Sequence, residues 1–328
     1  MKIAIIGCGA IGGYVGARLA LGGEQVTFMV RGANLEAVRS NGVKLISGDG
    51  SEEVARNVGA TFDYGEPGEQ DVVILAVKAH QLAAIAADVP RLFGAHTAVV
   101  TMQNGIPYWY FHEHGGELAG TVLRSVDPNG LVSRNLPAAR VIGCVVYPAA
   151  ELVAPGVVKV IEGDRFPVGE PDGTSSERVT RIAQCLTNGR LKSPVLSDIR
   201  AEIWLKLWGN LTFNPISALT RATLVDICQC PPTRELAVAM MTEAQSIAHK
   251  LGITFRVPLE RRIAGAEKVG KHKTSMLQDV EAGRPLEIDA LLGSVAELAR
   301  LTRTPTPHID SVYALSHLLA RTLTPPPA

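Results

Sequence analysis

The chain has 328 residues, of which 46% are hydrophobic and 20% are charged; this length suits two domains, and the composition excludes general disorder. Its 32 basic and 32 acidic residues cancel, so no charge imbalance indicates a nucleic-acid or anionic-membrane partner. No apolar run approaches the roughly 18 to 20 residues of a membrane span. The five cysteines show no CxxC spacing and no disulfide framework. We therefore expect a cytoplasmic protein with reduced thiols.

The first 110 residues alternate short β-branched runs with helical patterns. Strands are expected at residues 2–6, 26–30, 72–77 and 98–102, and a helix at residues 10–21. Strands that alternate with helices predict an α/β fold of the Rossmann type, with a doubly wound parallel sheet and helices on both faces. Three short runs between residues 140 and 170 predict antiparallel or mixed additions to the same sheet.

Strand patterns stop after Asp198. Helices are expected at residues 198–221, 233–251, 287–302 and 308–323. The sequence therefore predicts two domains: a Rossmann-type dinucleotide-binding domain at residues 1–197, and an all-helical domain at residues 198–328. Helix 233–251 is a candidate interface for a homodimer, which the sequence leaves open.

A glycine-rich turn, GxGxxG, joins the first predicted strand to the first predicted helix. Gly7 permits the tight turn, Gly9 lets the backbone approach a pyrophosphate, and Gly12 lets the helix pack close to the strand. The N–H groups at the helix start, from Ala10 and Ile11 onward, attract phosphate. This context predicts a dinucleotide site, and the alternative is a turn that binds nothing.

Arg31 follows the second predicted strand and lies 19 residues beyond Gly12. NAD-binding proteins usually carry an acidic residue there, which holds the ribose 2′-hydroxyl. A guanidinium at this position suits a 2′-phosphate through charge-assisted hydrogen bonds. The sequence therefore predicts NADP(H) as cofactor, with a surface arginine at a strand end as the alternative.

Two polar residues follow the third and fourth predicted strands: Lys78 and, after Gln103, Asn104. Ligands bind outside the carboxyl ends of strands in an open parallel sheet. Lys78 is therefore a candidate contact for the cofactor ribose or a substrate anion, and Asn104 for the substrate or the nicotinamide ribose. The alternatives are a solvated lysine and an ordinary Asn-Gly turn.

The helix expected at residues 198–221 places three polar residues on one face. Lys206, Asn210 and Asn214 are spaced by four, so they form a stripe on an otherwise apolar helix. A lysine in such surroundings is a plausible proton donor for a carbonyl undergoing reduction. The alternative is a lysine whose stem packs on the neighbouring tryptophans while its ammonium reaches solvent.

Together these elements resemble the ketopantoate reductase family. The resemblance rests on residues 1–13, Arg31, residues 77–78, residues 103–105, Lys206 with Asn210 and residues 214–215, and on SMLQD at 275–279 followed by EID at 287–289. It implies NADPH-dependent reduction of 2-dehydropantoate to pantoate. The chain departs from the family in a longer stretch between Asn104 and Lys206, which contains the aromatic residues 108–111.

The resemblance also implies roles for individual residues. Lys206 corresponds to the general acid and Glu287 to the carboxylate near it. The substrate contacts correspond to Asn104, Asn210, Asn214 and Ser275. The cofactor contacts correspond to Gly7, Gly9, Ala10, Ile11, Gly12, Arg31, Lys78 and Asn104.

Two of these positions also have local interpretations. Ser275 with Gln278 has the spacing of a capping box, and Glu287 has a favourable charge for a helix start. His112 and His114 with Glu113 form no plausible metal site, so no metal is expected. The alternative functions are reduction of another 2-keto acid, oxidation of a hydroxy acid, and NADP(H) sensing without catalysis. A small keto acid is the expected partner.

Overall fold

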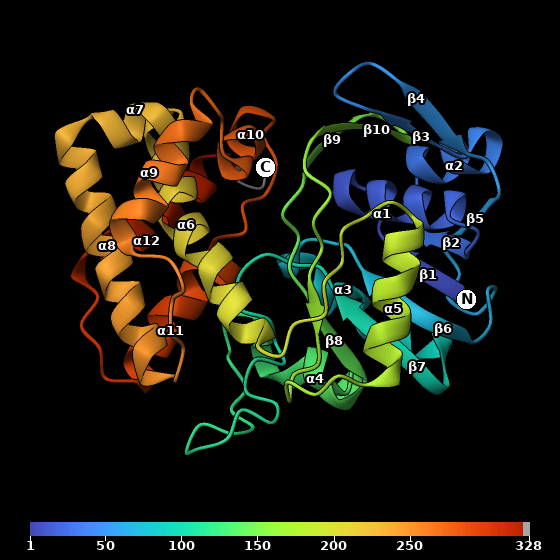
Figure 1. The fold of residues 1–328 in the computed structure, drawn as a ribbon, viewed down its shortest axis with the longest axis horizontal. Helices are drawn as coiled ribbons and strands as arrows, with labels where there is room; N and C mark the ends of the chain where they lie inside the picture. The colour runs from blue at the N-terminus through green and yellow to red at the C-terminus, as the bar shows by residue number, and fades with distance from the viewer. Residues whose placement is uncertain (324–328) are drawn as a thin grey trace. The chain divides into compact units, whose positions relative to one another are not determined.

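The computed structural model describes residues 1–323, which form two compact units (Figure 1). Unit 1 comprises Met1–Gln103, Pro107–Val122 and Asp127–Ile199. Unit 2 comprises Asn104–Ile106, Leu123–Val126 and the chain from Arg200 onward. The helical unit therefore takes two short segments from the first half of the chain, and one of them contains Asn104.

Unit 1 is built on a seven-stranded sheet with the strand order β11-β8-β7-β6-β1-β2-β5. The strands are β1 (Lys2–Ile6), β2 (Gln25–Met29), β5 (Val58–Thr61), β6 (Gln70–Leu75), β7 (Phe93–Thr101), β8 (Val141–Cys144) and β11 (Val168–Gly169). All neighbours pair in parallel except β11, which runs antiparallel to β8 at one edge. The predicted Rossmann-type α/β fold is confirmed.

A second sheet in unit 1 has four strands in the order β4-β3-β10-β9. They are β3 (Val43–Ile46), β4 (Glu52–Ala55), β9 (Ala149–Ala154) and β10 (Val157–Glu162). The expectation that the runs between residues 140 and 170 all extend the main sheet is therefore wrong for β10, and β9 was not expected from the sequence. Both strands are largely half-buried or exposed, which suits a sheet with one face toward solvent rather than a place in the buried parallel sheet.

Helix α1 (Ala10–Leu21) contacts β1 and β2 of the main sheet and all four strands of the second sheet. The other helical segments of unit 1 are α2 (Ala33–Asn41), η1 (Ala79–Gln81), α3 (Leu82–Ile85), η2 (Val89–Leu92), η3 (Pro128–Gly130), α4 (Leu131–Asn135), η4 (Ala138–Arg140) and α5 (Glu177–Asn188). The aromatic residues 108–111 are buried in this unit, where Tyr108 donates to the Leu136 carbonyl and Trp109 to the Thr101 hydroxyl.

Unit 2 is helical throughout its described elements, as the sequence predicts. They are α6 (Ile199–Thr220), α7 (Leu224–Gln229), α8 (Pro231–Lys250), α9 (Leu259–Val269), α10 (Ser275–Glu281), η5 (Asp289–Gly293), α11 (Ser294–Leu301) and α12 (Pro307–Leu323). Helix α6 buries Trp204 and Trp208 and continues through Pro215 without ending there. The single helix expected at residues 287–302 is in fact one π-helical turn, η5, followed by α11.

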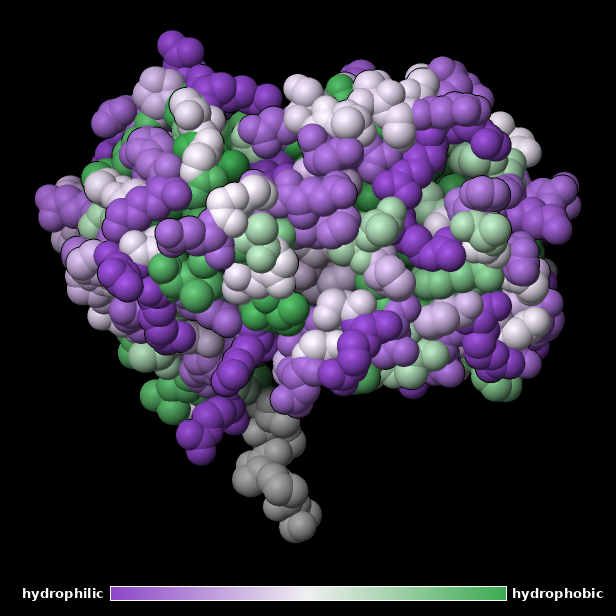
Figure 2. All heavy atoms as spheres, turned by 90° about the horizontal axis from the view of Figure 1, so that it is seen from below, coloured by the Kyte–Doolittle hydropathy of each residue, from purple (hydrophilic) through white to green (hydrophobic). Residues whose placement is uncertain are grey.

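Hydrophilic and hydrophobic side chains are mixed on the surface. Figure 2 shows one face, on which hydrophilic residues surround smaller hydrophobic patches. Within the described part of the chain, no helix is both long enough and apolar enough to cross a membrane.

Candidate active site

The glycine-rich turn has the geometry that a dinucleotide pyrophosphate requires. Strand β1 ends at Ile6, and α1 begins at Ala10 with Gly9 as its N-cap. A Cβ on Gly12 would lie 2.0 Å from the Gly7 carbonyl oxygen, so this close helix-to-strand approach requires glycine. A Cβ on Gly9 would meet no atom within 4 Å, which leaves the helix start accessible to a phosphate. These residues fit the predicted cofactor.

Asn34 on α2 fixes the position of this turn. Its Nδ2 donates to the Cys8 carbonyl at 3.3 Å, and its Oδ1 accepts from the Gly156 N–H at 3.0 Å. Asn34 is not among the residues predicted from the sequence, although it lies only three residues after Arg31. A side-chain amide five residues past the end of β2 carries no spacing signal of its own, because its partners, Cys8 and Gly156, are distant in the sequence.

Arg31 is exposed two residues beyond the end of β2. Strands β2 and β5 pair in parallel, so the loop after β5 reaches the same edge of the sheet. Tyr64 in that loop lies near enough to respond to the guanidinium. Burial raises the pKa of Tyr64 to about 12, and the charge of Arg31 opposes that rise. An exposed guanidinium within electrostatic range of a half-buried tyrosine fits the phosphate-bearing ribose of a dinucleotide.

Lys78 lies farther from its strand than the sequence predicts, because β6 ends at Leu75 and not at Val77. Its N–H donates to Gln81 Oε1 at 3.1 Å, and its side chain is half-buried. Gln103 holds the intervening segment: its Nε2 donates to the Leu75 and Val77 carbonyls at 2.9 and 3.1 Å. Gln103 is thus a second residue for which our sequence analysis gave no role.

A chain of three polar side chains forms the centre of the site in unit 2. Lys206 Nζ on α6 donates to Asn104 Oδ1 at 2.7 Å. Asn104 Nδ2 donates in turn to Glu287 Oε2 at 3.5 Å. All three side chains are half-buried. The arrangement places an ammonium, an amide and a carboxylate in one hydrogen-bonded line, as a positioned proton donor requires.

The other predicted substrate residues lie along the same helix and at the start of α10. Asn214, 6% exposed, donates from Nδ2 to Ser275 Oγ at 3.4 Å. Asn210 lies one helical turn from both Lys206 and Asn214 and is half-buried. The stripe on α6 therefore joins the lysine to an exposed serine hydroxyl that is available to an anionic ligand.

The capping box expected at Ser275 and Gln278 is wrong. Helix α10 begins at Ser275, and its N-cap is the preceding residue, Thr274, whose hydroxyl accepts from the Leu277 N–H at 3.3 Å. Gln278 instead donates to the Lys273 carbonyl at 3.2 Å. Thr274 and Ser275 are adjacent in the sequence, and either hydroxyl could cap the helix. In the structure the buried Thr274 is the N-cap. This leaves the Ser275 hydroxyl free of a capping role.

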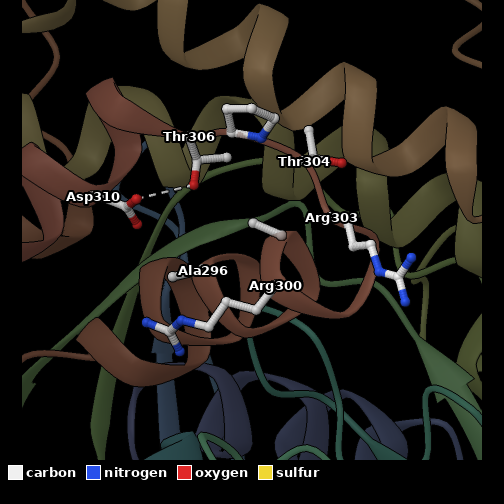
Figure 3. Close-up of a pocket in the computed structure, with 8 residues that line it drawn as sticks. Ala296, Arg300, Arg303, Thr304, Thr306 and Asp310 are labelled. Atoms are coloured by element: carbon white, nitrogen blue, oxygen red, sulfur yellow. Dashed lines mark hydrogen bonds between the residues drawn. The ribbon is translucent and has the colours of Figure 1, made fainter.

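A shallow cavity elsewhere in unit 2, between α11 and α12, contains none of the predicted site residues. Thr306 donates to Asp310 at 3.3 Å there, whereas the side chains of Arg300 and Arg303 extend in different directions (Figure 3). Its charged groups do not converge on one point. No cluster of three or more metal-ligating side chains occurs among residues 1–323.

Comparison with known proteins bears on both units. The family model of ketopantoate reductase PanE/ApbA matches residues 3–173, and that of its C-terminal domain matches residues 198–320. A 2-dehydropantoate 2-reductase of Mesorhizobium japonicum is 54% identical over 321 residues and is covered to 98%, as is this chain.

Solved structures agree with this assignment. A chain from Ralstonia solanacearum MolK2 has a TM-score of 0.93 and 42% identity, with 98% of both chains covered. The 2-dehydropantoate 2-reductase of Methylococcus capsulatus has a TM-score of 0.83 and 27% identity, with 99% of both chains covered. The chain belongs to the ketopantoate reductase family.

Proposed function

We propose that this protein is a 2-dehydropantoate 2-reductase, which reduces 2-dehydropantoate to pantoate with NADPH. The observation that carries the proposal is the line from Lys206 through Asn104 to Glu287, in a chain that is 54% identical to a 2-dehydropantoate 2-reductase. A non-catalytic NADP(H) sensor has no need of a lysine held in this way.

The glycine turn of unit 1 binds the cofactor. The N–H groups at the start of α1, from Ala10 and Ile11 onward, receive the pyrophosphate. Arg31 binds the 2′-phosphate, and Lys78 contacts the ribose beyond β6. When bound, NADPH supplies the hydride that reduces C2 of the keto acid. The guanidinium of Arg31 is the feature that favours NADPH over NADH.

Lys206 supplies the proton. An ammonium has three N–H donors, and Asn104 takes one of them at 2.7 Å. A second N–H is directed to the substrate keto oxygen, which gains the proton as the carbonyl becomes a hydroxyl. Lys206 then regains a proton from solvent. Glu287 keeps the Asn104 amide oriented with its oxygen toward the lysine, since its carboxylate accepts only from the NH2 end.

The substrate carboxylate binds at the other end of the stripe. Ser275 has an exposed hydroxyl, and Asn214 directs its amide toward it. The first N–H groups of α10 add partial positive charge at the same place. Asn210, between Lys206 and Asn214, contacts the middle of the substrate. The site therefore suits a 2-keto acid with its carbonyl at one end and its carboxylate at the other.

The proposed location of the protein is the cytoplasm, and its proposed assembly is a homodimer. None of the five cysteines, all within the described residues, forms a disulfide, which suits the reducing cytoplasm. The expected partner is the keto acid, together with a second copy of the chain. Helix α8, our candidate interface, leaves Val238 38% exposed. Light scattering tests the dimer, which has twice the 34.9 kDa mass of one chain.

A panel of 2-keto acids tests the function directly. NADPH oxidation is followed with 2-dehydropantoate, pyruvate, 2-oxoisovalerate and a 2-keto acid with an aromatic side chain, each at several concentrations. The proposal expects the highest kcat/KM with 2-dehydropantoate. A clearly higher kcat/KM with another keto acid contradicts 2-dehydropantoate as the substrate and identifies that acid instead. Tight NADPH binding with no turnover of any acid contradicts catalysis.

A further inference from the structure

The segment that carries Asn104 is docked on the π-helical turn η5. The Ile106 N–H donates to the Ala290 carbonyl at 3.2 Å. Gly105 has φ +89°, and a Cβ there would lie 2.1 Å from the Ala290 carbonyl oxygen. Only glycine permits this approach, so the Asn-Gly pair is more than a turn dipeptide. The position of the Asn104 amide thus depends on where the turn lies.

The same turn also sets Glu287. Turn η5 begins two residues after it, and the Leu291 N–H donates to the Glu287 carbonyl at 3.3 Å. Single π-helical turns are rare and are frequent at functional sites. Two of the three members of the Lys206 line, Asn104 and Glu287, are therefore placed by one local irregularity in the backbone.

Tyr313 of helix α12 is hydrogen-bonded to one end of the turn and lies close to the other end. The Tyr313 hydroxyl donates to Asp289 Oδ1 at 3.0 Å, and His317 Nε2 lies 3.6 Å from the same oxygen. At the other end, a Cβ on Gly293 would lie 2.7 Å from the Tyr313 hydroxyl. Burial, with Asp289 adding to it, raises the pKa of Tyr313 to about 12, so its hydroxyl remains a donor at neutral pH.

We propose that turn η5, clamped by Tyr313, is the positioning element of the proton-donating site. Gly105, Asp289 and Tyr313 are positioning residues that act through Asn104 and Glu287. This inference rests on the proposed function for its turnover measurement. It goes beyond that function by assigning a role to the aspartate of the EID motif and to a tyrosine on another helix.

The first test weakens the clamp. Tyr313→Phe and Asp289→Ala each remove the hydrogen bond, and kcat with 2-dehydropantoate is expected to fall roughly threefold to tenfold. Asp289→Asn keeps an oxygen that accepts from Tyr313 and is expected to retain most of kcat. The matched control is Leu318→Ala, because Leu318 is 59% exposed on the same helix. Wild-type kcat in both clamp variants contradicts the proposal.

The second test needs no turnover. Hydrogen exchange of the Ile106 amide reports the bond to Ala290, and in Tyr313→Phe it is expected to accelerate roughly threefold to tenfold. NADPH affinity and the melting temperature are expected to stay near wild type. A joint loss of NADPH affinity, stability and kcat indicates a general structural role and overturns the proposal. Unchanged exchange of the Ile106 amide in Tyr313→Phe also overturns the proposal. This result does not depend on turnover, so it is distinct from failure of the proposed function, which is shown by a wild-type protein that reduces no 2-dehydropantoate.

The strongest perturbation is at the docking contact. Gly105→Ala forces a Cβ into the Ala290 carbonyl, so Asn104 must shift, and kcat is expected to fall about 100-fold. Gly252→Ala is the matched control, since Gly252 also has a positive φ (+80°) but its Cβ would meet nothing within 4 Å. Equal kcat for the two variants contradicts a positioning role for Gly105.

Discussion

Lys206 and Asn104 are 102 residues apart in the sequence, and the Nζ of the first donates to the Oδ1 of the second at 2.7 Å. This contact forms because residues 104–106 belong to the helical unit, although they follow β7 of the main sheet. A three-residue segment from the N-terminal half of the chain thus provides the amide that orients Lys206.

Asn104→Ala tests that orientation. Without the amide the ammonium loses its fixed direction, and kcat is expected to fall about 10- to 100-fold, as misplacement by about 1 Å does in other sites. Steady-state kinetics with 2-dehydropantoate measures the loss. Asn135→Ala is the control, because this half-buried asparagine lies in unit 1 and donates from Nδ2 to the Leu131 carbonyl of its own helix. A kcat within twofold of wild type removes Asn104 from the site.

Adjacent hydroxyls at the start of α10 are expected to have separable roles. Thr274→Ala removes the helix cap and is expected to lower the free energy of unfolding by about 0.5–2 kcal/mol with little change in KM. Ser275→Ala is expected to raise KM for the keto acid about 10-fold with an unchanged melting temperature. Thermal melts and kinetics on both variants check this. The opposite pattern, with Ser275 governing stability, contradicts the assignment.

Arg31→Ala is expected to reduce the preference for NADPH. Loss of a charge-assisted hydrogen bond of about 1.5–3 kcal/mol raises KM for NADPH about 10- to 100-fold, whereas KM for NADH changes little. Arg56→Ala, at another exposed arginine of unit 1, serves as the control. A wild-type protein that prefers NADH is the result that contradicts the role of Arg31.

Cys8, within the glycine turn, is expected to resist alkylation. Burial raises the pKa of its thiol to about 12, so almost no thiolate exists at pH 8, whereas Cys230 is exposed. The unfolded thiol loses its proton near pH 9.0, below the folded value, so this group's contribution to stability falls as pH rises above about 9. Iodoacetamide with peptide mapping checks the order of labelling. Faster labelling of Cys8 than of Cys230 contradicts it.

The hydrophobic pattern of short sequence segments was sufficient to predict the strands and helices that depend on nearby residues alone. The expected strand at residues 2–6 and helix at residues 10–21 match β1 and α1. Both could be predicted because an apolar run and an Ala/Leu-rich segment flank a turn with the GxGxxG motif. The second sheet was missed. Its strands β3 and β10 are over 100 residues apart and pair only through tertiary contact, so neither has a partner that spacing reveals.

The candidate residues of the site came from the resemblance more than from spacing. The stripe on α6 was visible in the sequence, because a period of four is local. The bond from Asn104 to Lys206 and the cap at Thr274 were not visible, because both depend on which of several polar groups reaches its partner. The π-helical turn was also missed, because residues 290–296 are all buried and show no apolar/polar period in which a one-residue insertion could be recognised.

The central claim is that Lys206 donates the proton in reduction of 2-dehydropantoate. The most direct measurement is the rate of NADPH oxidation by the wild-type protein and by Lys206→Ala, both saturated with NADPH and 2-dehydropantoate, together with NADPH affinity by fluorescence. The expected result is turnover by the wild type and a loss of about 10²- to 10⁴-fold in the variant, with NADPH affinity unchanged. A variant that keeps more than half of the wild-type rate contradicts the claim.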